Sequence, residues 1–190
     1  MAWGANLLTN PSAETQDMTG WTSSGVSTEE KTTTALKENV HIKENDVTIN
    51  DTTYVGIDGL SGTYAFAFGS SSNAYMYQVL LASDIGDQPE NVQFVCAYKL
   101  KEQQNTWDST VVGYAKLKIA YDDGTFDYFI IPLILGVKTA TRYLTDFWVL
   151  VRNTCAVDSD KTLTYIEVRG IADKCEYDLL IDYYEFRKET

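Results

Sequence analysis

Few residues of this chain have the chemistry to break covalent bonds. A nucleophilic triad needs a positioned base, which is most often a histidine. The one histidine, His41, lies in the charged stretch 37–46, where such a side chain is usually exposed to solvent. The sequence also lacks the short motifs of serine hydrolases, phosphate-binding loops and zinc proteases. These features argue against nucleophilic catalysis.

Paired carboxylates are the second chemistry to consider, because a carboxylic acid and a carboxylate together can hydrolyse a glycosidic bond. The candidate pairs are Asp122 with Asp123, Glu29 with Glu30, and Asp158 with Asp160. All three pairs lie in predicted turns or polar loops, where aspartate is favoured because it hydrogen-bonds the nearby backbone. We therefore predict that the protein is not an enzyme.

Aromatic side chains offer binding chemistry instead. A flat ring can stack on the C–H face of a sugar while neighbouring polar groups bind its hydroxyls. Trp107, in a polar loop between Asn105 and Asp108, is the best single candidate for such a contact. The candidates on predicted strands, which could line a concave sheet face, are Tyr75, Tyr77, Gln78, Tyr114 and Tyr128. Packing in the core or at its rim is the more common use of strand aromatics.

Short strands separated by turn residues must position these side chains. The predicted strands are residues 6–10, 47–49, 53–57, 64–68, 75–82, 92–100, 114–121, 125–131, 145–151, 163–168 and 177–186. Asp122-Asp123-Gly124 predicts a tight hairpin, with Lys116 and Lys118 facing outward. Residues 22–39 form either a polar loop or an exposed edge. No segment predicts a helix, so the pattern favours an all-β sandwich or barrel.

Composition limits the partners. The 190 residues fit one domain, and the net charge of −12 argues against nucleic acid and against an anionic membrane surface. No apolar run approaches the roughly 18 residues of a membrane span, and no signal peptide is visible. The odd cysteine count and the spacing of Cys96, Cys155 and Cys175 favour free, buried thiols.

Motifs at both ends of the chain resemble a known family. Residues 6–14 read Asn-Leu-Leu-Thr-Asn-Pro-Ser-Ala-Glu and precede Gly20-Trp21, and residues 179–186 form an apolar segment at the other end. The further matching pieces are residues 62–68, 77–79, 94–99 and 181–182. Together they resemble the jelly-roll carbohydrate-binding modules of the galactose-binding-like superfamily. Ala13 and Tyr183 depart from that pattern, since the family usually has Phe and Asp there.

The resemblance implies an all-β jelly-roll β-sandwich of two antiparallel sheets. We expect a single domain over residues 1–190, with residues 1–5 as a possible N-terminal anchor and Trp3 inserted into a neighbouring subunit. In the family a structural calcium ion often lies where the first and last strands meet, and Glu14 and Asp182 match those positions. The alternative is that Glu14 caps a turn and Asp182 makes an internal hydrogen bond.

Modules of this kind without an export signal are similar to those in bacteriophage tail, baseplate and head proteins. We therefore predict a non-catalytic virion protein, made in the host cytoplasm, that adsorbs to a host glycan or cell-surface polysaccharide. Its expected partners are other virion proteins and further copies of itself as a homo-oligomer, with no nucleic acid and no membrane insertion. Two alternatives stay open: a structural virion protein without sugar binding, and an accessory polysaccharide-binding module.

Overall fold

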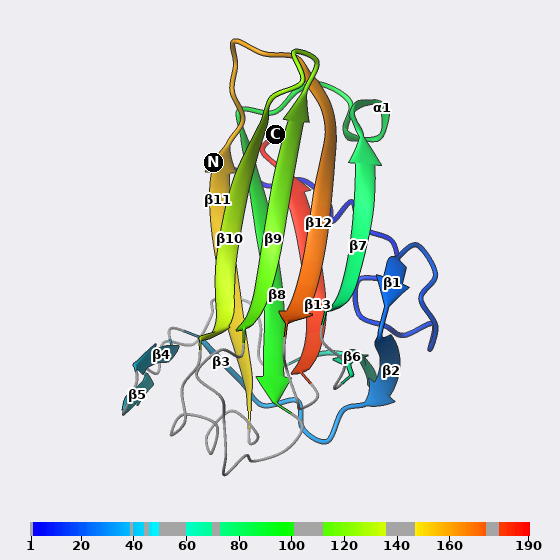
Figure 1. Ribbon diagram of the computed structural model, residues 1–190, viewed down its shortest axis with the longest axis vertical. Coiled ribbons are helices and arrows are strands. Elements are labelled where there is room, and N and C mark those ends of the chain that lie inside the picture. The colour runs from blue at the N-terminus through cyan, green and yellow to red at the C-terminus, as the bar shows by residue number, and fades with distance from the viewer. Residues whose placement is uncertain are drawn as a thin grey trace.

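Long strands form most of the protein (Figure 1). The computed structural model describes residues 2–38, 40–43, 46–49, 60–69, 73–100, 112–135, 147–173 and 179–190. Trp107, Cys175 and the predicted strand 53–57 lie outside the described residues.

The first sheet has five strands, which pair in the order β1-β7-β12-β9-β10. Their bounds are Thr22–Ser24 (β1), Ala74–Leu81 (β7), Leu163–Asp173 (β12), Val112–Tyr121 (β9) and Phe126–Leu135 (β10). All of these pairings are antiparallel. The predicted hairpin is confirmed, and Gly124 in the turn between β9 and β10 has a positive φ of 81°, which glycine adopts without strain.

The second sheet has six strands, in the order β2-β6-β13-β8-β11-β3. Their bounds are Val26–Glu30 (β2), Tyr64–Phe68 (β6), Leu179–Lys188 (β13), Asn91–Leu100 (β8), Trp148–Ala156 (β11) and Leu36–Glu38 (β3). The β11–β3 pairing is parallel and the others are antiparallel. The two sheets form the predicted jelly-roll β-sandwich. Among the described strands, only the β11–β3 pair at the sheet edge departs from the predicted antiparallel order.

Three smaller elements complete the described residues. A separate hairpin joins β4 (Val40–Lys43) to β5 (Asp46–Ile49), and α1 (Ala82–Ile85) is a single helical turn after β7. The sequence predicted no helix, and this one is too short to leave a periodic pattern. None of the helices among the described residues is long and apolar enough to cross a membrane.

The main core lies between the sheets. Its large, fully buried side chains include Phe66, Phe68, Met76, Phe94, Leu117, Ile119, Tyr184 and Phe186. A smaller cluster on the other face of the six-stranded sheet contains Ala65, Ala67 and Trp148. Aromatic and small residues thus alternate along the predicted strand 64–68, with Phe66 and Phe68 facing the other sheet.

The two ends of the chain lie together, as predicted. Leu7 N–H donates to the Phe186 carbonyl at 3.0 Å, and the Asn6 side chain donates to the Tyr184 carbonyl and accepts from Phe186 N–H. Residues 6–10 form no regular strand, contrary to prediction, because the Asn6 amide supplies hydrogen bonds that a strand backbone would supply. Trp3 forms an isolated β-bridge with Glu189, and its role as an intersubunit anchor stays a prediction.

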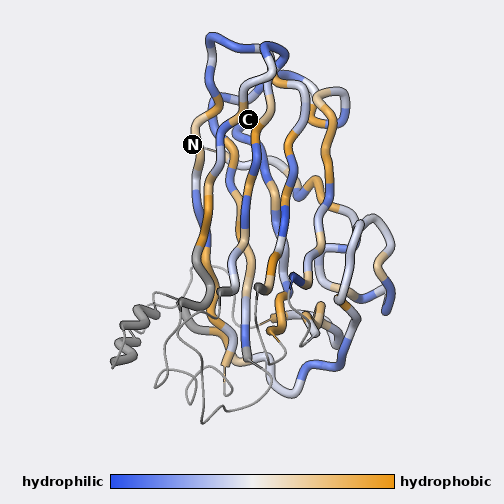
Figure 2. The backbone as a smooth tube through the Cα atoms, in the orientation of Figure 1, coloured by the Kyte–Doolittle hydropathy of each residue, from blue (hydrophilic) through white to orange (hydrophobic). Residues whose placement is uncertain are grey.

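Strands β1 to β3 show that the polar stretch after Trp21 is an exposed edge, one of the two predicted alternatives. Glu29 and Glu30, predicted to lie in a turn, end β2 instead. Strand β7 is buried on one face only, since Val79 and Leu81 are 42% and 54% exposed. Burial therefore alternates along β7, and Figure 2 shows hydrophobic and hydrophilic residues mixed along the long strands.

Two of the three cysteines lie in described residues. Cys96 and Cys155 are free, buried thiols, as predicted. Burial raises the pKa of both, to about 11 for Cys155. Neither thiol is therefore activated as a nucleophile.

Candidate functional site

The uncovered face of the five-stranded sheet gathers aromatic, aliphatic and basic side chains. We call it the outer aromatic face. Its residues are Tyr75, Tyr77, Val79 and Leu81 of β7; Tyr114, Lys116 and Lys118 of β9; Phe126, Tyr128 and Ile130 of β10; and Tyr165, Glu167, Arg169 and Ile171 of β12. They share one face because alternate side chains of a strand point the same way.

Strand register sets the order of side chains across this face. Arg169 lies opposite Tyr77 on β7 and opposite Lys116 on β9. Glu167, two residues earlier, lies opposite Val79 and Lys118. The charged residues therefore occupy the middle of the face, with apolar and aromatic residues on both sides.

The flanking apolar side chains are unusually open to solvent. On β10, Phe126, Tyr128 and Ile130 are 47%, 45% and 55% exposed. On β7, Val79 and Leu81 are exposed to a similar extent. Single exposed apolar residues are common, but grouped ones, such as the three on β10, are typical of binding surfaces.

Four of the predicted strand residues lie together on this face: Tyr75, Tyr77, Tyr114 and Tyr128. Gln78 does not join them, contrary to expectation. It is 7% exposed on the inner side of β7, where its amide bonds both the N–H and the carbonyl of Thr9 at 2.9 Å. Gln78 therefore holds the N-terminal segment against the sheet.

Other residues of the face were not singled out from the sequence. The missed candidates are Phe126, Tyr165, Glu167 and Arg169. The sequence did contain one indication of this face, because Lys116 and Lys118 were correctly predicted to point outward. Strand pairing then determines which residues of β10 and β12 point the same way.

Basic groups lie over the aromatic rings. Lys116 Nζ is 3.6 Å from the centre of the Tyr128 ring, and Lys118 Nζ is 4.7 Å from that of Phe126. Lys118 also donates a hydrogen bond to the Tyr165 hydroxyl at 2.7 Å, which raises the pKa of Lys118. These cation–π contacts hold the rings in fixed positions.

The predicted metal ligands meet where the chain ends meet, but a lysine lies between them. Lys31 Nζ donates to Asp182 Oδ2 and to the Ser61 carbonyl, both at 2.6 Å, and lies 3.8 Å from Glu14 Oε1. The side chains of Lys31 and Asp182 are each 1% exposed. Burial raises the pKa of Asp182 to about 6, although the Lys31 ammonium acts in the opposite direction.

Glu14 has a further structural role. Its Oε1 accepts hydrogen bonds from the N–H groups of Thr63 and Tyr64, at 2.9 and 3.0 Å. Gly62, with φ of 81°, lies against the same carboxylate. Glu14 thus caps the turn before β6, which is the alternative given for it in the sequence analysis.

These residues do not fit the implied calcium ion. Calcium takes about six to eight oxygen ligands, whereas three oxygens meet here and surround an ammonium group. Across the described part of the chain, no group of three or more His, Cys, Asp or Glu side chains could hold a metal ion. The Lys31 ammonium takes the place of a cation.

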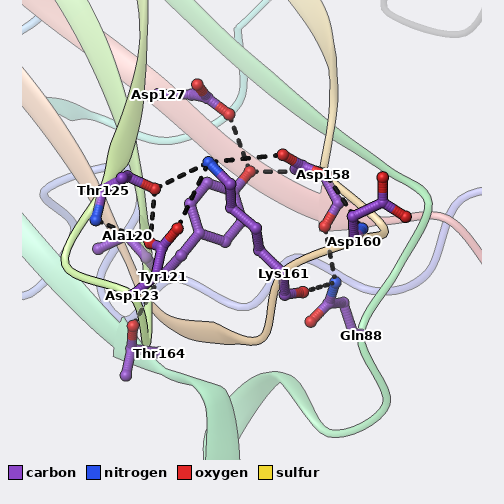
Figure 3. A network of polar contacts seen from close by, with 10 residues as sticks. All are labelled: Gln88, Ala120, Tyr121, Asp123, Thr125, Asp127, Asp158, Asp160, Lys161 and Thr164. Atoms are coloured by element: carbon purple, nitrogen blue, oxygen red, sulfur yellow. Dashed lines mark hydrogen bonds and ion pairs between the residues drawn. The ribbon is translucent and has the colours of Figure 1, made fainter.

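The loop carboxylates have structural roles. Figure 3 shows the network between the β9–β10 turn and the loop before β12. Asp123 accepts from Thr125 N–H at 2.8 Å, and Asp158 accepts from Asp160 N–H at 3.0 Å. Lys161 Nζ lies 3.7 and 3.6 Å from the carboxylates of Asp123 and Asp158. The predicted turn roles of these aspartates are confirmed.

The fold has known relatives among solved structures. The chain matches the enzymatically active domain of tailspike protein 4 from bacteriophage CBA120, with a TM-score of 0.55 and 13% identity over 96% of this chain and 21% of that one. It matches a module, TmCBM61, solved with β-1,4-galactotriose, with a TM-score of 0.54 and 13% identity over 98% and 100% of the two chains. It matches the CBM22-1 xylan-binding domain of Paenibacillus barcinonensis with a TM-score of 0.52 and 14% identity over 99% and 97%.

These likenesses establish the fold of carbohydrate-binding modules. The chain spans the full length of such modules but about a fifth of the tailspike chain. No protein-family model and no curated protein matches the sequence. The resemblance inferred from the sequence is therefore supported at the level of the jelly roll.

Proposed function

We propose that this protein is a non-catalytic glycan-binding protein and that the outer aromatic face contacts the glycan. The observation that carries the proposal is the group of open aromatic side chains on one sheet of a carbohydrate-binding-module fold, with Phe126 and Tyr128 nearly half exposed. Aromatic rings of this kind stack on the apolar faces of sugars.

The spacing suits a chain of sugars. Tyr77 on β7 and Tyr128 on β10 are three strand positions apart in the sheet, which corresponds to about 14 Å. Tyr128 is 45% exposed, whereas Tyr77 is half-buried with the Arg169 guanidinium 4.7 Å from its ring centre. An oligosaccharide lying across the strands would contact both, whereas a single sugar ring would contact one.

We propose further that the protein belongs to a bacteriophage virion and adsorbs to host-surface glycan. The likeness to a bacteriophage tailspike domain supports this setting. Other virion proteins and further copies of the chain are then its assembly partners. A structural virion protein is the main alternative, because an exposed apolar face is also suited to contact another protein.

Binding to a glycan array tests the proposal, with wild type beside Tyr128→Ala and Phe126→Ala. We expect each variant to lose about fivefold in affinity, since a stacked ring contributes roughly 1 kcal/mol. Trp3→Ala is the control, because Trp3 lies at the chain terminus beside Glu189 and off this face. Folded wild-type protein that binds no glycan, or binding that survives both face variants, would refute the proposal.

A further inference from the structure

The charge of the outer aromatic face is opposite to that of the protein. The chain has 27 acidic and 15 basic residues, for a net charge of −12. The outer aromatic face nevertheless carries three basic residues, Lys116, Lys118 and Arg169, and one acidic residue, Glu167. The middle of this face is therefore locally positive.

The basic residues are neighbours in the sheet, and their charged ends lie over different rings. Arg169 on β12 and Lys116 on β9 are direct cross-strand partners. The Arg169 guanidinium lies 4.7 Å from the centre of the Tyr77 ring on β7, and Lys116 Nζ lies 3.6 Å from that of Tyr128 on β10. Cations and aromatic rings therefore alternate across the face.

The nearby carboxylate does not balance all three cations. Glu167 Oε1 lies 2.9 Å from Arg169 Nε, with the two side chains 15% and 30% exposed. Lys118 gives one hydrogen bond to Tyr165, and an ammonium group has three donors. Lys116 lies over the Tyr128 ring, which accepts no strong hydrogen bond. The ammonium groups of both lysines therefore keep N–H donors that a ligand beside the exposed rings would accept.

We infer that the glycan is an acidic polysaccharide, whose carboxylate or sulfate groups bind Lys116, Lys118 and Arg169 while its sugar rings stack on Tyr128 and Phe126. This inference rests on the proposed function and specifies its ligand. The combination of rings and cations in one row suits a sugar polymer with charges at regular intervals. A neutral polymer would offer no charge to these cations.

Paired polysaccharides test the inference. The acidic probes are polygalacturonic acid, alginate, hyaluronan and heparin, each matched with its carboxyl-reduced or desulfated form. We expect the wild type to prefer the acidic member of at least one pair by about tenfold or more, and to lose that preference as salt screens the charges. Equal binding to both members, or preference for neutral members, overturns the inference and leaves glycan binding standing. No binding to any polymer overturns both.

The chain offers a matched control for the variants. Arg187 on β13 forms the same kind of pair with Glu185, two residues before it, at 2.6 Å and with Arg187 34% exposed, but on the other sheet. Lys116→Gln and Arg169→Gln should each weaken binding to the acidic polymer about fivefold to tenfold, and Arg187→Gln should not. An equal loss in Arg187→Gln would show a net-charge effect and refute the assignment.

A variant of an aromatic ring distinguishes glycan binding as such from the preference for an acidic glycan. Tyr128→Ala should weaken binding to both members of a pair, because the ring contacts the sugar itself. Lys116→Gln should weaken binding to the acidic member alone. If Lys116→Gln instead abolishes self-association of the protein, measured by sedimentation, and no polysaccharide binds, then the face is a protein interface and the inference fails.

Discussion

Lys31, which follows the edge strand β2, and Asp182 of the central strand β13 form a fully buried ion pair, with Nζ and Oδ2 2.6 Å apart. The residues are 151 positions apart in the chain. Because the Ser61 carbonyl also binds the ammonium, this one group joins three segments. Removing either charge leaves the other without its partner in a region from which water is excluded.

Lys31→Met should therefore destabilise the protein strongly. Breaking a buried pair by removing one partner costs about 3–5 kcal/mol, because an uncompensated charge remains. Urea unfolding at pH 7 measures the loss. Lys161→Met is the control, since Lys161 is 31% exposed and its ion pairs are weak. Similar losses in the two variants would contradict the role given to Lys31.

The pH dependence of stability follows from Asp182. Burial raises its pKa from 3.8 to about 6 in the folded protein. The folded state then holds the proton more tightly than the unfolded state, so this residue stabilises the fold below about pH 4 and that contribution is lost as pH rises through 6. The free energy of unfolding of wild type, measured against Asp182→Asn, should fall between pH 4 and pH 6. A flat or rising difference would show that the Lys31 ammonium outweighs burial.

Calcium should have little effect on the wild type. The ammonium of Lys31 occupies the position between Glu14, Ser61 and Asp182, so we expect calcium or a chelator to shift Tm by less than about 1 °C. A chelator that lowers the Tm of wild type would restore the calcium expectation drawn from the family.

Gly62→Ala tests the turn that Glu14 caps. Gly62 and Gly124 both have φ of 81°, but a Cβ at Gly62 would collide with the Glu14 carboxylate, whereas nothing lies within 4 Å at Gly124. Gly124→Ala should cost about 1 kcal/mol for the positive φ alone. Gly62→Ala should cost more, and both losses are measured by thermal unfolding. Equal losses would indicate that the Glu14 carboxylate moves aside freely.

The strands were the most predictable part of the structure. Period-two alternation located the strands of both sheets because each strand has one face toward the core. The hairpin at residues 122–124 was predictable because Asp-Gly favours positive φ. The edge strands β1 and β3 were not, since short polar segments pair only when a neighbouring strand is in place.

The candidate site was predictable in part, because alternation along a strand shows which of its residues share a face. Outward residues of β9 show the strand phase directly, so Tyr114, Lys116 and Lys118 were placed correctly. Gln78 was misplaced because its strand has apolar residues on both faces, so the sequence does not show which face is buried. Arg169 and Glu167 became part of the face only through the register of β12 between β7 and β9.

The sequence by itself determined the jelly-roll class, the meeting of the chain ends, and the approach of Glu14 to Asp182. These depend on local patterns and on short motifs. The tertiary structure decided what lies between the two carboxylates, because nothing in the polar segment 22–39 distinguishes Lys31 from Lys37 until the sheet folds around it. Likewise, only strand pairing gathers three cations and several exposed rings on one face, since residues far apart in sequence become neighbours through register alone.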